Sequence, residues 1–492
     1  MKIYNTQQTK DWDHFTIQNE PIASIDLMER AAKAVVNELL HSKYQDKPFY
    51  IFCGNGNNGG DGLAVARQLN VTQRQVKIFV LEANRYTSDY ITNLQKAKSL
   101  NLSIKEIDGA EEFPIIPTDA IVLDALFGSG LNRPLIGLAA MLVQHINQHH
   151  AIISIDIPSG LFADTSSLGG AIIKATTTLS FQVPKLAFFM AENAVYTGEW
   201  KILDIGLHKQ YSLQTKSEYK LLELPFIKSI IKPRPKFSHK YYYGHALLYT
   251  GSPGMYGAGI LCAKACLKSG VGLVSVMVDE KHLPIYQTTL PEAMCVTDWN
   301  NDEVFIKKNA IGIGPGWANS EAYIHTSRKV LSHNSLPLII DASALQLLFD
   351  ENIQKGLPPE TIITPHLGEF EKCFGKSKND FDLLQLLMQK AKELNIYIVL
   401  KGPYTTIATP EGKVYFNNTG NAGMAKGGSG DVLTGLLTGL LAQSYSPLHT
   451  CLIGVYLHGL AGDIAAEAHT QYAMTAMDII DKMGEAWKLL LE

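Results

Sequence analysis

The sequence predicts an α/β protein made of two doubly wound, three-layer domains. Short apolar runs, many of them β-branched, alternate with helix-length segments along most of the chain. Most of these runs are continuously apolar, which is typical of parallel strands covered by helices on both faces. Two such series are separated by Ile231-Lys-Pro-Arg-Pro-Lys236, because its prolines can continue neither a helix nor a central strand.

The first series predicts a domain over residues 1–210. A helix is expected at residues 24–40, where apolar residues recur with helical spacing. The helix-length segments between the strands imply right-handed crossovers within one sheet. The strands are expected at residues 49–53, 76–81, 120–126, 151–155, 175–181 and 200–205.

The second series predicts a domain over residues 237–492. Residues 211–236 are expected to be a linker, since they are polar at the start and rich in proline at the end. A helical region is expected from residue 431 onward. The strands are expected at residues 245–250, 273–278, 310–313, 336–340, 361–363 and 396–400.

The composition is that of an ordinary globular protein. The chain has 492 residues, of which 46% are hydrophobic and 18% charged, and this excludes disordered and fibrous classes. A net charge of −4 argues against a nucleic-acid or membrane-surface partner, which would favour a basic excess. The first residues lack the features of a signal peptide, and the longest apolar run, residues 432–442, is short for a membrane span. We therefore expect a cytoplasmic protein with reduced thiols.

A glycine-rich loop follows the first strand of the N-terminal series. It reads Gly54-Asn-Gly-Asn-Asn-Gly-Gly-Asp-Gly62 and contains the dinucleotide fingerprint G-x-G-x-x-G, in which amides at a helix N-terminus hold phosphate. By itself this short pattern fits an ordinary tight turn as well. The loop also carries Asn57, Asn58 and Asp61, whose side-chain oxygens go beyond the generic fingerprint.

Two further polar loops, residues 124–134 and 154–160, follow strands of the same series. Ligands of open α/β sheets bind outside the carboxyl ends of the strands, so the three loops should converge. Asn58, Asp124 and Ser159 would then form an oxygen-rich pocket suited to a hard cation. A single acid at a strand end is most often a turn or cap residue, so Asp124 alone would indicate no site.

Four motifs together resemble the NAD(P)H-hydrate epimerase domain: Leu27-Met-Glu-Arg-Ala-Ala32, Gly56-Asn-Asn-Gly-Gly-Asp-Gly62, Asp124-Ala-Leu-Phe-Gly-Ser-Gly-Leu-Asn-Arg-Pro134 and Asp156-Ile-Pro-Ser-Gly160. The resemblance covers residues 1–210 and implies a Rossmann-like fold. It implies a potassium ion held by Asn58, Asp124 and Ser159. It also implies contacts to a hydrated nicotinamide nucleotide from Asn57, Asn58, Gly59, Gly60, Asp61, Gly128, Ser129, Gly130, Leu131, Asn132, Arg133, Pro134 and Asp156.

Epimerisation of such a hydrate needs little chemical equipment. C6 carries a hydroxyl next to the ring nitrogen, whose lone pair can expel it, and water can return on either face of the ring. A carboxylate that gives and takes a proton at that oxygen is sufficient. We expect Asp156 in this role, with Lys185 as its electrostatic partner.

The densest glycine cluster of the chain is Asn421-Ala-Gly-Met-Ala-Lys-Gly-Gly-Ser-Gly-Asp431. It precedes a helix, where free backbone amides and the helix dipole favour an anion. Asp431 follows in the first turn, where it can take a proton from a hydroxyl that attacks a phosphoryl group; helix capping is its alternative role. The arrangement resembles the ribokinase-like superfamily, whose terminal Gly-x-Gly-Asp carries the catalytic base.

Further strand-end clusters at residues 250–259, 312–317, 364–369 and 401–405 resemble the ADP-dependent NAD(P)H-hydrate dehydratase over residues 235–490. The family usually reads Asp-Ala-Asp-Ala-Leu where this chain has Asp341-Ala-Ser-Ala-Leu345, so Ser343 cannot fill the role of a second acid. The resemblance implies Mg²⁺ as cofactor. It implies substrate contacts at Ala258, Gly316, His366 and Asp431, and ADP or AMP contacts at Lys401, Gly402, Pro403, Tyr404, Thr405 and Gly430.

Both resemblances together predict a bifunctional enzyme that repairs NADHX and NADPHX. The first half would interconvert the R and S hydrates. The second would phosphorylate the C6 hydroxyl with ADP and then expel phosphate, a reaction that mainly needs positioning and charge neutralisation. Two alternatives stay open here: a ribokinase-like kinase of a small vitamin alcohol fused to a nucleotide-binding domain, and an N-terminal half that binds ligand without chemistry. We expect a homo-oligomer.

Overall fold

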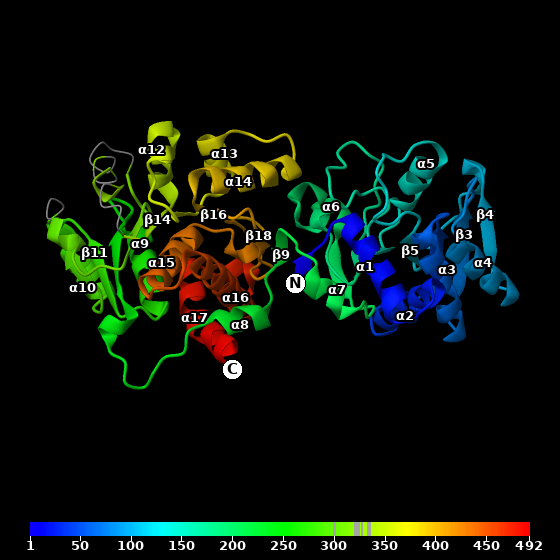
Figure 1. Cartoon of the computed structure of the whole chain (residues 1–492), viewed down its shortest axis with the longest axis horizontal. Coiled ribbons are helices and arrows are strands. Elements are labelled where there is room, and N and C mark those ends of the chain that lie inside the picture. The colour runs from blue at the N-terminus through cyan, green and yellow to red at the C-terminus, as the bar shows by residue number, and fades with distance from the viewer. Residues whose placement is uncertain (299–301, 319–324, 326–327, 332–335) are drawn as a thin grey trace. The chain divides into compact units, whose positions relative to one another are not determined.

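The computed structural model describes the chain except for residues 299–301, 319–324, 326–327 and 332–335 (Figure 1). The described residues form two compact units. The N-terminal unit comprises Lys2–Ser217 and Asn379–Phe381, and the C-terminal unit comprises Met1, Glu218–Lys378 and Asp382–Glu492. Each unit has a sheet and a hydrophobic core of its own.

The N-terminal sheet is parallel and has seven strands in the order β4-β3-β2-β5-β6-β7-β8. In its centre Phe52 pairs with Phe79 on one side and with Asp124 on the other. Every residue of β2 and β5 is buried, which explains their continuous apolar character. The strands are β2 (Phe49–Cys53), β3 (Val76–Leu81), β4 (Ile104–Ile107), β5 (Ile121–Ala125), β6 (Ile152–Ile155), β7 (Thr177–Phe181) and β8 (Glu199–Leu203).

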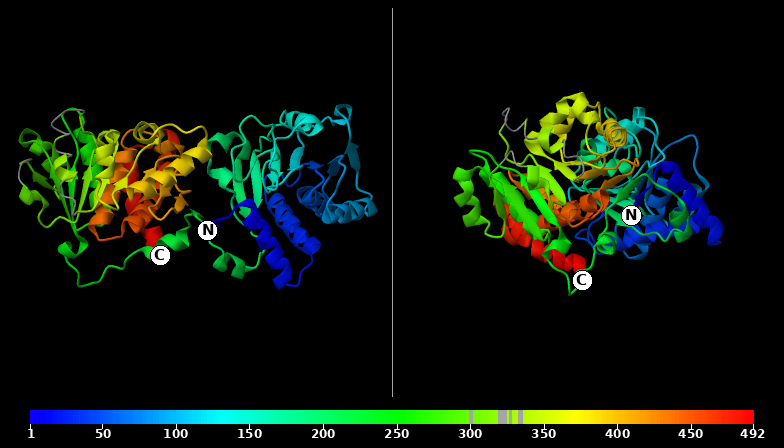
Figure 2. Two further views of the ribbon diagram at one scale, coloured as in Figure 1. Left: turned by 45° about the horizontal axis from the view of Figure 1, so that its top comes forward. Right: turned by 60° about the vertical axis from the view of Figure 1, so that its left-hand side comes forward.

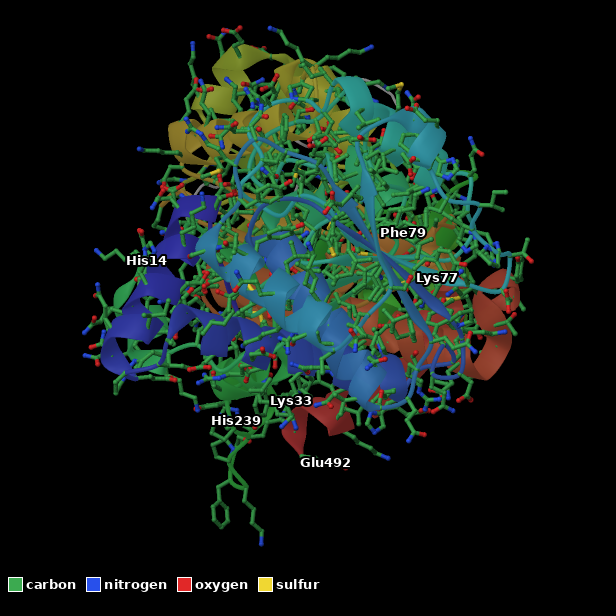
Figure 3. The ribbon with its side chains drawn as sticks, turned by 90° about the vertical axis from the view of Figure 1, so that its right-hand side faces the viewer. His14, Lys33, Lys77, Phe79, His239 and Glu492 are labelled. Atoms are coloured by element: carbon green, nitrogen blue, oxygen red, sulfur yellow. The ribbon has the colours of Figure 1, made fainter. Side chains whose placement is uncertain are left out.

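Helices cover both faces of this sheet, as Figure 3 shows with Lys33 on one of them and Phe79 on β3. Leu63 packs on one face with Leu123, and Leu142 packs on the other with Val122. The strand β1 (Lys2–Ile3) precedes the helices, which are α1 (Thr6–Asn19), α2 (Ser24–Leu40), α3 (Asn57–Val71), α4 (Ser88–Ser99), α5 (Gly137–Ile146), α6 (Ala194–Thr197) and α7 (Lys209–Gln214).

The strand order of this sheet reverses between β2 and β5. The chain continues from β2 to β3 and β4 on one side, and from β5 to β6, β7 and β8 on the other. At such a switch point the loops that follow the two central strands diverge and leave a crevice for a ligand. The segments after Cys53 and Ala125 therefore border the same crevice.

The C-terminal sheet runs from β9 to β12 in the order β9-β18-β17-β16-β15-β14-β13-β10-β11-β12. Its pairs are parallel except β16 with β17 and β17 with β18, which are antiparallel. The order reverses between β10 and β13, which is the second switch point of the chain. The strands are β9 (Tyr219–Leu221), β10 (His245–Tyr249), β11 (Leu273–Met277), β12 (Met294–Val296), β13 (Ala310–Ile313), β14 (Leu338–Ile340), β15 (Ile362–Ile363), β16 (Tyr397–Leu400), β17 (Thr406–Ala408) and β18 (Val414–Phe416).

Helices lie on both sides of this sheet as well. Figures 1 and 2 show the yellow helices on one side and the orange to red helices on the other. They are α8 (Leu224–Ile230), α9 (Tyr256–Lys268), α10 (Leu283–Thr289), α12 (Glu351–Lys355), α13 (Leu367–Phe374), α14 (Asp380–Leu394), α15 (Ser429–Ala442), α16 (Pro447–Ala473) and α17 (Ala476–Leu491). Helix α16 is long and apolar enough to cross a membrane, but 61% of its most apolar window is buried inside the protein.

Glycines let α9 and α15 approach closely. A Cβ on Gly435 would lie 1.9 Å from the carbonyl oxygen of Cys262, and a Cβ on Gly439 would lie 2.1 Å from Oγ of Ser269. The later glycine of α15, Gly439, thus lies against the later residue, Ser269, at the end of α9. The two helices are therefore parallel, and both N-termini lie at the same edge of the sheet.

The structure contains every strand expected from the sequence, with bounds that differ by only a few residues. It adds β1, β4, β9, β12, β17 and β18, most of which are too short for a clear periodic signal. The segment 211–236, expected to be a linker, contains β9 and α8, and the compact C-terminal unit includes the chain from Glu218. Only the stretch around residues 232–237 is extended and exposed.

Candidate active sites

A buried carboxylate organises the loops at the N-terminal switch point. Asp124, in β5, accepts hydrogen bonds from the hydroxyl of Ser159 at 2.5 Å, the backbone N–H of Ser159 at 2.9 Å and the hydroxyl of Ser154 at 2.7 Å. The backbone N–H of Phe127 in turn donates to Oγ of Ser159 at 2.8 Å. Burial nevertheless raises the pKa of Asp124. These bonds join the loop after β5 to the loop after β6.

Asn58 lies against these loops with an unsatisfied side chain. Its Cβ lies 3.3 Å from the position of a Cβ on Gly128. It is only 7% exposed, and among the described residues neither its Oδ1 nor its Nδ2 has a hydrogen-bond partner. A buried amide without a partner is costly. Its oxygen, with those of Asp124 and Ser159, therefore fits the hard cation that the sequence led us to expect.

The loop residues Asn57–Asp61 belong to the start of α3. No side chain caps the N-terminus of this helix, so its amides suit an anionic ligand. A Cβ on Gly60 would lie 2.8 Å from Sδ of Met28, so α2 packs tightly here. Burial raises the pKa of Asp61 well above its ordinary value, and the carboxylate of Asp156 adds to this effect.

The segment 128–134 forms an open wall of the crevice. The backbone carbonyl of Ser129 accepts a hydrogen bond from the hydroxyl of Thr6 at 3.2 Å. Gly130, Asn132, Arg133 and Pro134 are exposed. The side chains expected to hold nucleotide are therefore accessible to it.

Asp156 and Lys185 form the expected ion pair. Nζ of Lys185 lies 2.7 Å from Oδ1 of Asp156, and their side chains are 2% and 13% exposed. Nζ also donates to Oγ of Ser180 at 3.0 Å. Asp156 has a φ of +67°, a strained conformation that for a non-glycine residue is common at active sites. The carboxylate is thus held in a defined position at the end of β6.

The second site lies at the N-terminus of α15. Gly428 precedes this helix in the left-handed conformation, with a φ of +95°, and no side chain caps the helix. Asp463 holds the preceding loop, because it accepts hydrogen bonds from the N–H of Gly420 at 2.9 Å and from Nδ2 of Asn421 at 3.0 Å. The first turn of α15 is therefore a preorganised anion site.

A buried ion pair lies directly beside this helix start. Nζ of Lys401 donates to Oδ1 of Asp341 at 2.8 Å, and the hydroxyl of Thr434 donates to Oδ2 of Asp341 at 2.6 Å. Glu369 lies 4.0 Å from the same ammonium. A Cβ on Gly430 would lie 3.3 Å from Nζ of Lys401. The site thus has a fixed positive charge where a phosphoryl group would bind.

The surroundings of Asp431 raise the pKa of its carboxyl. Burial and the carboxylate of Asp341 raise its pKa to about 6, while Lys401 opposes this shift. A base with a pKa near the working pH is efficient. His458 of α16 lies next to the first residue of α15, Ser429. Burial lowers the pKa of His458 to about 4, so its imidazole is neutral at pH 7.

Two expected substrate residues, Ala258 and Gly316, meet at the second switch point. A Cβ on Gly316 would lie 2.9 Å from Cβ of Ala258. His366 caps α13: its Nδ1 accepts from the N–H of Glu369 at 3.3 Å, and its own N–H donates to Oε2 of Glu369 at 2.8 Å. The imidazole is still 60% exposed, so it remains open to a ligand.

The segment 401–405 divides into two parts. Lys401 joins the carboxylates beside α15, whereas Gly402 and Pro403 are exposed in the connection to β17. The hydroxyl of Ser343 donates to the carbonyl of Trp317 at 3.0 Å, so this departure from the usual acid is accommodated by a local bond. Among the described residues, no group of three or more His, Cys, Asp or Glu side chains is suited to a metal ion.

Comparison with known proteins finds matches to both halves of the chain. One sequence-family model, described as YjeF-related protein N-terminus, matches residues 24–187, and another, described as NAD(P)H-hydrate dehydratase, matches residues 246–485. A bifunctional NAD(P)H-hydrate repair enzyme (Nnr) from Moorella thermoacetica is 36% identical over 98% of this chain and 96% of its own length. The chain belongs to this repair-enzyme family.

Other relatives support the same assignment. A repair enzyme of the same name from Thermofilum pendens is 31% identical over 100% of this chain and 97% of its own length. A solved ribokinase-like superfamily protein from Enterococcus faecalis V583 is 31% identical, with a TM-score of 0.51 over 56% of this chain and 99% of its own. The predicted fold class and the family resemblance are confirmed.

Sequence reasoning missed several groups of the repair-enzyme sites. Asp341 and Thr434, which fix Lys401, are spaced far apart in sequence and meet only in the fold. Asp341 directly follows β14, so its place at the end of a strand is the same signal that marked Asp124. Asp13 of α1 also faces the N-terminal site, and nothing in its local sequence pointed there.

Proposed function

We propose that this member of the repair-enzyme family carries out both steps of NAD(P)H-hydrate repair. The N-terminal unit epimerises R- and S-NAD(P)HX, and the C-terminal unit dehydrates the S form with ADP, giving NAD(P)H, AMP and phosphate. The observation that carries the proposal is that one chain holds two acid-bearing sites at switch points. One is the Asp156–Lys185 pair, and the other is Asp431 at the start of α15.

In the epimerase half, the start of α3 and the segment 128–134 bind the nucleotide. Asp156 exchanges a proton with the oxygen on C6. Asn58, Asp124 and Ser159 would hold a potassium ion, which would supply a fixed positive charge and a partner for the unpaired Oδ1 of Asn58. The ion pair with Lys185 keeps the Asp156 carboxylate in place during the exchange.

In the dehydratase half, Ala258, Gly316 and His366 contact the substrate. Asp431 takes the proton of the C6 hydroxyl, whose oxygen attacks the β-phosphorus of ADP while AMP leaves. The lone pair of the ring nitrogen then expels phosphate to form the N1=C6 iminium, and loss of a proton from C5 to the departing phosphate forms the C5=C6 bond of the dihydronicotinamide. Lys401 and the amides at Gly430 neutralise the transferred charge, and residues 402–405 border the nucleotide. Mg²⁺ would enter bound to the diphosphate, since Asp341 is already engaged by Lys401 and Thr434.

A single assay tests the proposed function. The protein is incubated with a mixture of R and S hydrates and with ADP, and the absorbance of restored dihydronicotinamide is followed. Complete conversion of both epimers is expected. A plateau at the S fraction would show that the first half is inactive, and no ADP-dependent recovery would rule out the second. A phosphorylated vitamin alcohol formed in place of NAD(P)H would favour a kinase instead.

Potassium is expected to stabilise the N-terminal unit and to support epimerisation. A ligand at one hundred times its dissociation constant stabilises a folded protein by about 2.7 kcal/mol. We expect the unfolding midpoint to rise as tetramethylammonium is replaced by potassium at constant ionic strength. Asn58→Ala should abolish this potassium dependence, because it removes the buried oxygen. An unchanged dependence in this variant would place the ion elsewhere.

The cytoplasmic location and the homo-oligomeric state also belong to this proposal. Light scattering on the purified full chain tests the latter directly. A monomer at micromolar concentration would contradict it.

A further inference from the structure

One face of α1 lines the N-terminal site. Thr6, Lys10 and Asp13 are spaced i, i+4 and i+7, so they share that face of the helix. The hydroxyl of Thr6 donates to the carbonyl of Ser129 at 3.2 Å. Nζ of Lys10 lies 3.5 Å from the position of a Cβ on Gly130. The face that carries Asp13 therefore meets the segment expected to bind the nucleotide.

Packing fixes α1 in this position. The buried ring of Trp12 belongs to a cluster with Val183, two residues before Lys185. Nε1 of Trp12 donates to the carbonyl of His208 at 2.9 Å, and the N–H of His208 donates to Oγ1 of Thr16 at 3.0 Å. The residue after Asp13, His14, points to solvent on the outer side of α1 (Figure 3). Asp13 is partly buried and shares the face of Thr6 and Lys10.

The carboxyl of Asp13 belongs to the same charge cluster as the Asp156–Lys185 pair. Burial and the carboxylate of Asp156 raise the pKa of Asp13 to about 7, and the ammonium of Lys185 opposes this shift. Asp61 faces the same cluster, since both Asp156 and Asp13 raise its pKa. The site thus pairs the Asp156 carboxylate, which is held by Lys185, with a second carboxyl whose pKa is raised to about 7, as in sites that use one group as acid and the other as base.

The sequence led us to expect that one carboxylate is sufficient for epimerisation, but the two faces of the ring set a further geometric requirement. Water leaves from one face of the ring and returns to the other. A proton must be given to the departing hydroxyl on the first face and removed from the attacking water on the second. One fixed carboxylate reaches only one of these oxygens at hydrogen-bond distance.

We propose that Asp13 is the second acid–base residue of the epimerase site and serves the ring face opposite to Asp156. This inference rests on the epimerase function proposed above. In one direction, the Asp13 carboxyl gives its proton to the C6 hydroxyl, the C–O bond breaks, and the ring nitrogen's lone pair forms the N1=C6 bond. Water then attacks C6 from the other face, the π electrons return to nitrogen, and Asp156 takes the water's proton. In the reverse direction the two residues exchange roles.

The test compares three variants of the full chain: Asp13→Asn, Asp11→Asn and Asp61→Asn. Asp11 lies on the same helix and is exposed. Asp11→Asn removes the same charge as Asp13→Asn, so it is the matched control. Each variant is assayed for epimerisation of the separated R hydrate, with the uncatalysed rate subtracted, over a range of pH. ADP-dependent dehydration of the S hydrate by the same sample reports that the chain is folded.

We expect Asp13→Asn to lower kcat/KM for epimerisation about 100-fold or more, with normal dehydratase activity, while Asp11→Asn stays close to the parent. The parent rate should fall as the pH rises through about 7, because Asp13 must be protonated. Asp13→Asn should lack this fall. Full epimerisation by Asp13→Asn would overturn the inference. So would a result in which the decrease of the rate above pH 7 persists in Asp13→Asn and is absent in Asp61→Asn. If the parent protein does not epimerise at all, the proposed function itself fails.

Discussion

Replacing Asp431 by asparagine is expected to lower ADP-dependent dehydration by about 10²–10⁴-fold, the usual contribution of a general base. Asparagine keeps the shape of the side chain but cannot accept the proton of the C6 hydroxyl. The helix start, Lys401 and the proposed substrate contacts at Ala258 and Gly316 remain intact. The loss should therefore appear mainly in kcat, with a small change in KM.

Unfolding does not explain such a loss. An acid in a first helical turn stabilises a helix by about 0.3–1 kcal/mol, which is small beside the stability of a domain. Epimerisation by the same sample provides an internal control. Asp481→Asn, an exposed acid on α17, is the matched control and should retain dehydration. Dehydration that persists in Asp431→Asn would remove this residue as the base.

The pH profile gives an independent readout of the same group. Burial and Asp341 raise the pKa of Asp431 to about 6, and the base must be ionised to act. The parent's kcat/KM should therefore rise as the pH increases through about 6 and then level off. A single ionisation of this kind makes the rate at pH 5 about tenfold lower than on the plateau. The residual rate of Asp431→Asn should show no such rise.

The sequence predicted the parts of both sites that depend on local pattern. Continuous apolar runs indicated the parallel strands, and an acid or a glycine cluster after a strand marked the edge where ligands bind. Asp124 and Ser159 were expected to converge, and their hydrogen bonds show that they do. The ion pair of Lys185 with Asp156 was also expected and is present.

The rest depends on contacts between distant segments. Asp341, Lys401 and Thr434 form one cluster, although 93 residues separate Asp341 from Thr434. No motif in α1 marks Asp13, because its helix meets the site through tertiary contacts, among them the hydrogen bond from Thr6 to Ser129 and the packing of Trp12 in a cluster with Val183. The strands β17 and β18 were not predicted because each has only three residues, too few for a periodic pattern to show.

Replacing Asp156 by alanine is expected to abolish epimerisation and to destabilise the N-terminal unit as well. Lys185 is 2% exposed, and the variant would leave its ammonium without a charged partner. Breaking a buried ion pair in this way costs about 3–5 kcal/mol. Loss of activity in this variant alone would therefore not distinguish a catalytic role from unfolding.

The double variant Asp156→Ala with Lys185→Met separates the two effects. Methionine has a similar length and no charge, and exchanging a buried ion pair for apolar residues is often neutral for stability. We expect the free energy of unfolding, measured in urea, to be higher for the double variant than for Asp156→Ala and close to that of the parent. Epimerisation should stay about 10²–10⁴-fold below the parent, because no carboxylate remains at the end of β6. A double variant that regains both stability and epimerisation would show that Asp156 only balances the charge of Lys185 and takes no part in the proton transfer.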